Sequence, residues 1–446
     1  MKYNFPEGFK WGSAVWAQGT EGAYDTDGKA PTVWDEYYRL QPERFVDRVG
    51  PNDTLNWYED YEKYADLAKD IKHNSFRTSI MWARLLPDGK TVNQKAVEFY
   101  KKMFQSFKDR GMEMYVVLYW FDMPLAYEDK GGFTNREIID DFVFYCKTCF
   151  ELFDGLVDIW YIYNEPIVDV FIKYLNDICY PNKLDFDAAN QAVYNMVIAH
   201  ASVVKEYKKK AYQGKIGTVL NHSFTYPRSN HPADIQAAEN DNLLYKKCFS
   251  YPMLNGYMPE EWFTLISSVG KRPDVEEGDA ELIKENTIDV LGINVYGPGR
   301  VKAKEHALHP NAPITYDSFS DPYEMHGREM NPYRGWEIYP QVIYDVLMEL
   351  KNEYGNPEIY ITENGMGVQD EYRIDYVKRH LQCAHDAIKD GANLLEYHMW
   401  SFIDLWSPTN QFKNCYGFYE YNLQTGHSKR KKSADWFEKV TIDNGF

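Results

Sequence analysis

The sequence has few cysteines and no long apolar run, and both scarcities narrow the classes of protein that it can encode. Six cysteines in 446 residues are too few for a small secreted fold held by disulfides. Cys146 and Cys149 form a CxxC pair, but the pair lies in a helical pattern without a second pair, so core packing is a better interpretation than a metal site. No stretch approaches the length of a membrane span, and no apolar segment follows Met1. We therefore expect a cytoplasmic protein that has no membrane partner.

The sequence also has fewer basic than acidic residues. The chain has 49 Lys and Arg against 67 Asp and Glu, a net charge of −18, which would repel nucleic acids and anionic membranes. Its 11 histidines are scattered without HExxH or HxH spacing, so we expect no metal and no other cofactor. The charge says little about a small or neutral substrate.

The chain shows no internal break either. It has no linker, no block of like charge, no low-complexity tract and no repeat, so we predict one domain over residues 1–446. Aromatic residues, by contrast, are abundant, with 12 Trp and 37 Tyr. Any single ring is more often part of a core, but sugar rings pack on aromatic faces, and the set as a whole favours a sugar site.

Short apolar runs alternate with amphipathic helical patterns, such as residues 58–71 and 339–354, as is typical of repeated βα units. The eight runs that we predict as barrel strands are 10–17, 75–82, 113–120, 158–164, 215–222, 289–296, 358–364 and 394–402. The intervals 223–288 and 297–336 are longer than one helix needs. Active sites of such barrels form on the loops that follow the strands. We predict an α/β protein, a single (β/α)8 TIM barrel with long βα loops.

Two of the predicted strands end in a glutamate. Glu165 ends the fourth strand in Asn-Glu-Pro, and Glu363 lies at the end of the seventh in Thr-Glu-Asn-Gly. We expect these strands to lie on opposite sides of the ring, so that the carboxyl groups face each other across its mouth. A retaining glycosidase needs two carboxyl groups about 5 Å apart, one to protonate the leaving oxygen and one to attack the anomeric carbon.

The neighbouring residues predict different pKa values for the two carboxyl groups. Arg77, near the end of the second strand, would hold Glu363 ionised by charge and hydrogen bonding. Glu165 lies among aromatic residues without a cation nearby in sequence, so desolvation would keep it protonated.

Six motifs occur in order on the predicted strands and loops: FPEGFKWGSAVWAQGTEGA, FRTSIMWARLLPDG, YNEP, LGINVYG, GWEIYP and YITENG. With them the chain resembles glycoside hydrolase family 1, the β-glucosidases and 6-phospho-β-glucosidases, from end to end. The resemblance implies that Glu165 is the acid/base and that Glu363 is the nucleophile, oriented by Arg77 and Tyr296. It also implies that Asn164 binds the sugar 2-hydroxyl.

Further sugar contacts are implied by the same resemblance. Gln18 would contact the 3- and 4-hydroxyls, Trp400 would form a platform under the sugar, and Trp336 would border the leaving-group side. One position departs from the family pattern. Trp120 stands where a histidine normally binds the 3-hydroxyl, which removes a hydrogen bond and adds bulk.

The segment after the eighth strand gives a divided indication of the sugar. Ser407 replaces the glutamate of plain β-glucosidases, as in the 6-phospho branch, where a carboxylate would repel the phosphate. That branch has Ser, six residues, Lys, one residue, Tyr; Ser407 and Tyr416 match, but Asn414 occupies the lysine position, with Lys413 beside it. Without a cation a phosphate would be bound poorly, so Asn414 predicts weak or no preference for phosphorylated sugars.

The sequence therefore predicts a retaining exo-β-glycosidase that hydrolyses β-glucoside-type bonds in two steps, with ancestry in the 6-phospho branch and a β-glycoside as its small-molecule partner. A true 6-phospho-β-glucosidase remains an alternative. A non-catalytic sugar-binding barrel is another, motivated by Trp120, and a glycosyl-transferring enzyme would use the same intermediate.

Overall fold

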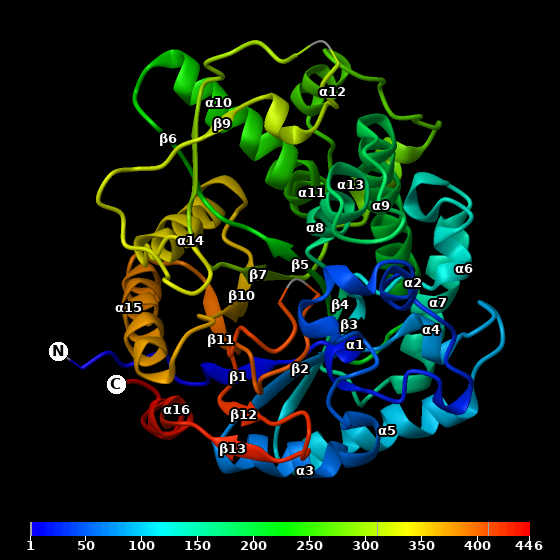
Figure 1. Ribbon diagram of the computed structural model, residues 1–446, viewed down its shortest axis with the longest axis vertical. Helices are drawn as coiled ribbons and strands as arrows, with labels where there is room; N and C mark the ends of the chain where they lie inside the picture. The colour runs from blue at the N-terminus through cyan, green and yellow to red at the C-terminus, as the bar shows by residue number, and fades with distance from the viewer. Residues whose placement is uncertain (1, 310, 409) are drawn as a thin grey trace.

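Eight parallel strands close into a barrel at the centre of the molecule (Figure 1). The computed structural model describes residues 2–309, 311–408 and 410–446. The strands follow the ring order β1-β11-β10-β7-β5-β4-β3-β2. Their bounds are β1 Lys10–Ala14, β2 Ser75–Ser79, β3 Glu113–Tyr119, β4 Ile159–Asn164, β5 Lys215–Asn221, β7 Val290–Asn294, β10 Glu358–Asn364 and β11 Leu394–Trp400. These are the eight predicted runs, seven of them shortened at one or both ends and β10 with the predicted bounds, so the predicted (β/α)8 barrel is confirmed.

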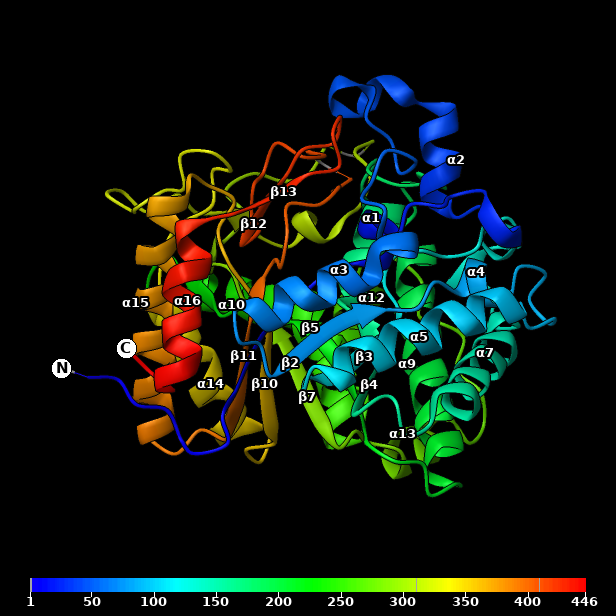
Figure 2. The ribbon, with the colours of Figure 1, turned by 90° about the horizontal axis from the view of Figure 1, so that it is seen from below.

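Helices surround the barrel (Figure 2). In α5 the buried stripe includes Val97, Tyr100, Phe104 and Phe107, whose spacing of three and four residues matches the helical period. The longer helices are α3 Trp57–Asp70, α5 Gln94–Asp109, α7 Ile138–Phe153, α9 Phe186–Lys208, α14 Gln341–Glu353, α15 Asp370–Lys389 and α16 Lys432–Asp443. No helix in the described ranges is long and apolar enough to cross a membrane.

Shorter helices and turns lie in the connections that link the barrel strands and the longer helices. The remaining α-helices are α1 Ala17–Thr20, α2 Val33–Leu40, α4 Trp82–Leu85, α6 Leu125–Glu128, α8 Pro166–Val170, α10 Pro232–Asn242, α11 Cys248–Ser250, α12 Glu260–Ser267 and α13 Asp279–Glu285. The 3-10 and π turns are η1 Thr26–Gly28, η2 Pro42–Arg44, η3 Val46–Arg48, η4 Gly132–Thr134, η5 Phe171–Leu175, η6 Leu243–Lys247, η7 Tyr251–Asn255 and η8 Tyr316–Ser318. Cys146 and Cys149 are buried in α7, which confirms their packing role.

The two long intervals carry structure of their own. Strands from both, β6 (Thr225–Pro227), β8 (Gly299–Lys302) and β9 (Asp321–Pro322), form a three-stranded sheet. A two-stranded sheet, β12 (Tyr419–Tyr421) with β13 (Ser428–Arg430), follows the last barrel strand. Both small sheets belong to loops that follow barrel strands, where such folds build their sites.

The ring order corrects one prediction. The fourth and seventh barrel strands, β4 and β10, are separated by β5 and β7. The expectation that they lie on opposite sides is wrong, because each strand pairs with its sequence neighbour and the strand opposite the fourth is the eighth, β11. The two glutamates thus lie on the same side of the barrel mouth.

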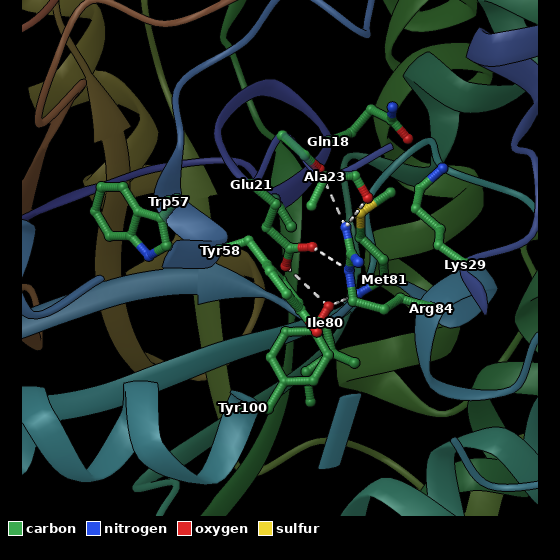
Figure 3. A network of polar contacts seen from close by, with 12 residues as sticks. Gln18, Glu21, Ala23, Lys29, Trp57, Tyr58, Ile80, Met81, Arg84 and Tyr100 are labelled. Carbon is green, nitrogen blue, oxygen red and sulfur yellow. Dashed lines mark hydrogen bonds and ion pairs between the residues drawn. The ribbon is translucent and has the colours of Figure 1, made fainter. Parts of the chain in front are cut away.

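A buried ionic network fixes the segment that follows β1 (Figure 3). Glu21 accepts hydrogen bonds from Arg84 Nε at 2.7 Å and from the Tyr100 hydroxyl at 2.8 Å. The Tyr100 oxygen accepts in turn from the backbone N–H of Met81 at 2.9 Å. Because both charges are buried and paired, removing one partner would leave an uncompensated charge. The network therefore ties this segment, which carries Gln18, to the chain that follows β2.

Candidate active site

A cavity of about 640 Å³ opens at the carboxyl ends of the barrel strands. Its volume is within the range of small-molecule sites, roughly 300–1,000 Å³. Ten of the twelve predicted site residues line it: Trp120, Asn164, Glu165, Tyr296, Trp336, Glu363, Trp400, Ser407, Asn414 and Tyr416. The other two, Arg77 and Gln18, are buried outside the lining. The sequence thus placed ten of its twelve predicted site residues in one cavity wall.

Glu363, in β10, is held on both carboxylate oxygens. Oε1 accepts from Arg77 Nη1 at 2.8 Å, and Oε2 accepts from the Tyr296 hydroxyl at 2.7 Å. Burial raises the pKa of Glu363 above its usual value, while Arg77 and then Tyr296 oppose that rise. The expected contact with Arg77 is present, but its charge limits the rise in pKa rather than reversing it.

Glu165 lies between β4 and α8 with its backbone in the left-handed region, at φ 47° and ψ 59°. Non-glycine residues rarely adopt this conformation, and it concentrates at functional sites. Burial, followed by the negative charge of Glu363, raises the pKa of Glu165 to about 8. Burial thus raises the pKa of Glu165 as predicted, whereas the pKa of Glu363, which Arg77 was expected to hold down, is raised as well.

Asn294, the last residue of β7, connects the two carboxyl-bearing strands. Its Nδ2 donates to Glu165 Oε1 at 2.9 Å and to Asn164 Oδ1 at 3.1 Å, and its Oδ1 accepts from the Thr362 hydroxyl at 2.7 Å. This asparagine lies in the LGINVYG motif, but the sequence did not predict a role for it. Its position as a polar residue ending a barrel strand was the signal that could have identified it.

The side chain of Asn164 has a fixed orientation. Its Oδ1 accepts from both Arg77 Nη2 and Asn294 Nδ2, which assigns the oxygen and nitrogen of the amide unambiguously. Its buried Nδ2 has no hydrogen-bond partner within the described residues, and Asn164 lines the cavity. A buried amide N–H without a partner is costly, so a ligand oxygen at this place would be favoured.

Trp120 packs against the cation of the site. Its ring lies 4.2 Å from the guanidinium carbon of Arg77 and 5.7 Å, centroid to centroid, from the ring of Trp400. Such a cation–π contact helps to fix the buried guanidinium that holds Glu363. The large ring that stands in place of the family's histidine thus supports Arg77. Gln18 Oε1 accepts from the Thr32 hydroxyl at 3.1 Å, and its role as a sugar ligand stays a prediction.

The rim beyond the glutamates contains the segment expected to recognise the 6-position. Ser407, Asn414 and Tyr416 line the cavity, whereas Lys413 is exposed and is not part of the lining. Another loop contributes a positively charged side chain to the cavity. Arg334 lines it and donates from Nη1 to the Tyr416 hydroxyl at 2.7 Å. Arg334 was not among the residues predicted from the sequence. Within the described ranges, no group of three or more His, Cys, Asp or Glu side chains is placed to hold a metal.

Comparisons with known proteins give matches that cover the whole chain. The model of Glycosyl hydrolase family 1 matches residues 1–446. The chain is 45% identical over 460 residues to the 6-phospho-beta-glucosidase GmuD of Bacillus subtilis, covering 100% of this chain and 99% of the relative. It is 33% identical to Beta-glucosidase A of Acetivibrio thermocellus, with 100% of both chains covered. The beta-glucosidase from Thermotoga maritima in complex with glucoimidazole superposes with a TM-score of 0.91 at 30% identity, covering 100% of both.

Proposed function

The chain belongs to glycosyl hydrolase family 1 and is a retaining β-glycosidase, and from that premise we propose that Glu363 is its nucleophile and Glu165 its acid/base. The observation that carries this assignment is the contrast between the two carboxyl groups in one cavity. Glu363 accepts from a guanidinium and a hydroxyl, which stabilise its charged form, whereas Glu165 accepts from the neutral amide of Asn294.

In the first step, a carboxylate oxygen of Glu363 forms a bond to the anomeric carbon as the bond from that carbon to the leaving oxygen breaks. Glu165 gives its proton to the leaving oxygen. A covalent glycosyl-enzyme results, and the charge of Glu363 is consumed in the new bond. Because that charge is one cause of the raised pKa of Glu165, the pKa of Glu165 falls at this stage. Glu165 is then suited to take a proton from the water that attacks in the second step.

The surrounding groups support these steps. Arg77 and the Tyr296 hydroxyl orient the nucleophile and disperse its charge. The unpaired Nδ2 of Asn164 donates to the sugar 2-hydroxyl, where hydrogen bonds strengthen in the transition state. Trp400 supplies an apolar face for the sugar ring, and Trp336, 38% exposed, borders the leaving group at the mouth.

The substrate class is a β-glucoside-type bond at the non-reducing end of a small glycoside, with or without a 6-phosphate on the sugar. The relatives named above support both forms, because one is a 6-phospho-beta-glucosidase and another a beta-glucosidase. The four fully buried cysteines, Cys146, Cys149, Cys179 and Cys248, are free thiols, which suits the reducing cytoplasm where we place the enzyme.

Proton NMR of the first product formed tests the proposal directly. Hydrolysis of a nitrophenyl β-glycoside should release the β-anomer first, with the α-anomer appearing by slow mutarotation. Release of the α-anomer first would refute a glycosyl-enzyme on Glu363. An acceptor alcohol added to the same reaction would report transfer, since it competes with water for the same intermediate.

A further inference from the structure

The loop after β11 contains the phosphate-binding pattern of the 6-phospho branch without its cation. Asn414 lines the cavity at the position of the expected lysine, but its amide is neutral. Lys413, the adjacent cation, is exposed and does not line the cavity. Ser407, Asn414 and Tyr416 together offer neutral donors alone, which bind phosphate about half as strongly as charged ones.

Arg334 brings a positive charge to this group from the loop between β9 and α14. Its Nη1 donates to the Tyr416 hydroxyl at 2.7 Å, and its guanidinium carbon lies 3.8 Å from the centroid of the Trp336 ring. Its charge also opposes, in small part, the rise in the pKa of Glu165, so it lies within electrostatic reach of the reacting groups. The cation is therefore inside the cavity and beside the residue that ends the phosphate pattern.

The loop that presents Arg334 is tightly built. Asn331 Oδ1 accepts from the backbone N–H of Arg334 at 3.3 Å, and the Asn331 carbonyl accepts from the N–H of Gly335 at 2.9 Å. Gly335 has a φ of 71°, a conformation that favours glycine. A bridge between Met330 and Glu337 closes the base of the loop. The guanidinium is thus held near the cavity before any ligand binds.

Arg334 differs from the neighbouring arginines in having no carboxylate. In the described part of the chain it forms no ion pair, whereas Arg300 pairs with Glu337 at 2.7 Å and Arg328 with Glu324 at 3.0 Å. A guanidinium has five N–H donors, and the contact with Tyr416 uses one. Because the Tyr416 oxygen accepts that bond, the hydroxyl hydrogen remains available for a second acceptor. The arrangement presents several donors and one unneutralised charge to a common point.

We infer that Arg334 replaces the missing lysine and makes the enzyme specific for β-glycosides that carry a 6-phosphate on the sugar. The inference rests on the proposed function and selects one of its two substrate forms. Several donors on different sides of the anion suit the three terminal oxygens of a phosphate, and the guanidinium matches two of them at once. The weak preference expected from Asn414 alone is thereby replaced by a strong one.

The test compares kcat/KM on nitrophenyl β-glucoside 6-phosphate, β-glucoside and β-glucuronide for wild type and variants. We expect the wild type to prefer the phosphorylated substrate, and Arg334→Gln to reduce the ratio of phosphorylated to plain substrate by roughly 10- to 100-fold. Arg334→Lys should retain part of the ratio. Adding Asn414→Lys to Arg334→Gln should restore it, because that lysine returns the cation to the expected position. Lys413→Gln is the matched control and should leave the ratio unchanged.

Several results would overturn the inference while leaving the glycosidase intact: a wild type that prefers the plain glucoside or the glucuronide, equal losses on both substrates in Arg334→Gln, or a loss of ratio in Lys413→Gln. A double variant that shows no rescue would also count against it. Thermal unfolding with glucose 6-phosphate and with glucose gives a readout that does not depend on turnover. We expect the phosphate to raise the Tm more than glucose does in wild type but not in Arg334→Gln; equal shifts in wild type would contradict the inference even if no substrate is cleaved.

Discussion

The catalytic floor and the anion rim of the cavity are built in opposite ways. The floor, which consists of Arg77, Asn164, Glu165, Asn294, Tyr296 and Glu363, comes from or directly follows four barrel strands. The rim, which consists of Arg334, Ser407, Asn414 and Tyr416, comes from two loops after the strands. Floor residues form a continuous set of hydrogen bonds, whereas the rim contains one bond between its two loops, from Arg334 to Tyr416.

Under the proposed function, this difference assigns the chemistry to the floor and the choice of substrate to the rim. Strand pairing fixes each floor residue against its neighbours, as in the register of Glu363 with Asn294. A change there would break several bonds at once. The rim can exchange one donor for another, since a guanidinium on one loop can bind the phosphate in place of an amine on another loop. The floor should therefore be intolerant of substitution and the rim adjustable.

The sharpest contrast should come from Glu363→Gln, in the floor. Loss of the nucleophile removes the covalent route, so we expect kcat to fall by at least about 10⁴-fold on every substrate. Steady-state kinetics with phosphorylated and plain nitrophenyl glucosides would measure it, with the unfolding transition as a control for folding. A variant that keeps more than a few per cent of wild-type activity on either substrate would break the distinction between floor and rim.

Glu165→Gln should separate substrates by leaving group rather than by sugar. Proton donation matters for poor leaving groups, where we expect a loss of about 10²- to 10⁴-fold in kcat/KM. Dinitrophenyl glycosides should still form the intermediate, and azide should accelerate its slow breakdown by replacing the water that needs a base. Equal losses on both leaving groups without azide rescue would show that Glu165 is not the acid/base.

The pH profile tests the electrostatics of the floor. The pKa of Glu165 is raised to about 8, and its protonated form is the acid, so kcat/KM on a poor leaving group should fall as pH rises through that value, approaching tenfold per unit. Glu165→Gln should abolish this alkaline limb for the same substrate. An alkaline limb that persists unchanged in the variant would assign the titration to another group.

The same raised pKa has a consequence for stability. The folded state favours protonated Glu165, whereas the unfolded chain ionises it above the usual glutamate pKa. Compared with a side chain that does not ionise, Glu165 therefore lowers the free energy of unfolding little below that pKa and increasingly as pH rises toward 8. We expect Glu165→Gln to match wild type near pH 4.5 and to be more stable by about 2–4 kcal/mol at pH 8. Urea unfolding at the two pH values measures this difference. A constant difference across that range would contradict the pKa assignment.

The smallest effect should come from a neutral donor of the rim. Ser407→Ala removes one hydroxyl and no charge, so kcat/KM on the phosphorylated glucoside should fall by about 3- to 10-fold. The same variant should change the plain glucoside less. A loss as large as that of Glu363→Gln would mean that the rim takes part in the chemistry and not in recognition alone.

The sequence predicted the floor better than the rim, for a physical reason. Strand ends can be identified from periodicity, so Glu165 and Glu363 could be placed at the same end of the barrel, and ten of the twelve predicted residues line the cavity. Their separation around the ring was misjudged, and Asn294 was left without a role. Arg334 carried no signal, because its position depends on a turn built by Asn331 and Gly335 in a long interval without periodic pattern.

Trapping of the glycosyl-enzyme tests the central claim most directly. The wild type would be incubated with a dinitrophenyl 2-deoxy-2-fluoro-β-glucoside, in phosphorylated and plain forms, digested, and its labelled peptide identified by mass spectrometry. The account predicts one equivalent of label on Glu363, with faster labelling by the phosphorylated form. A label on any other residue, or turnover of these compounds without a covalent adduct, would contradict it.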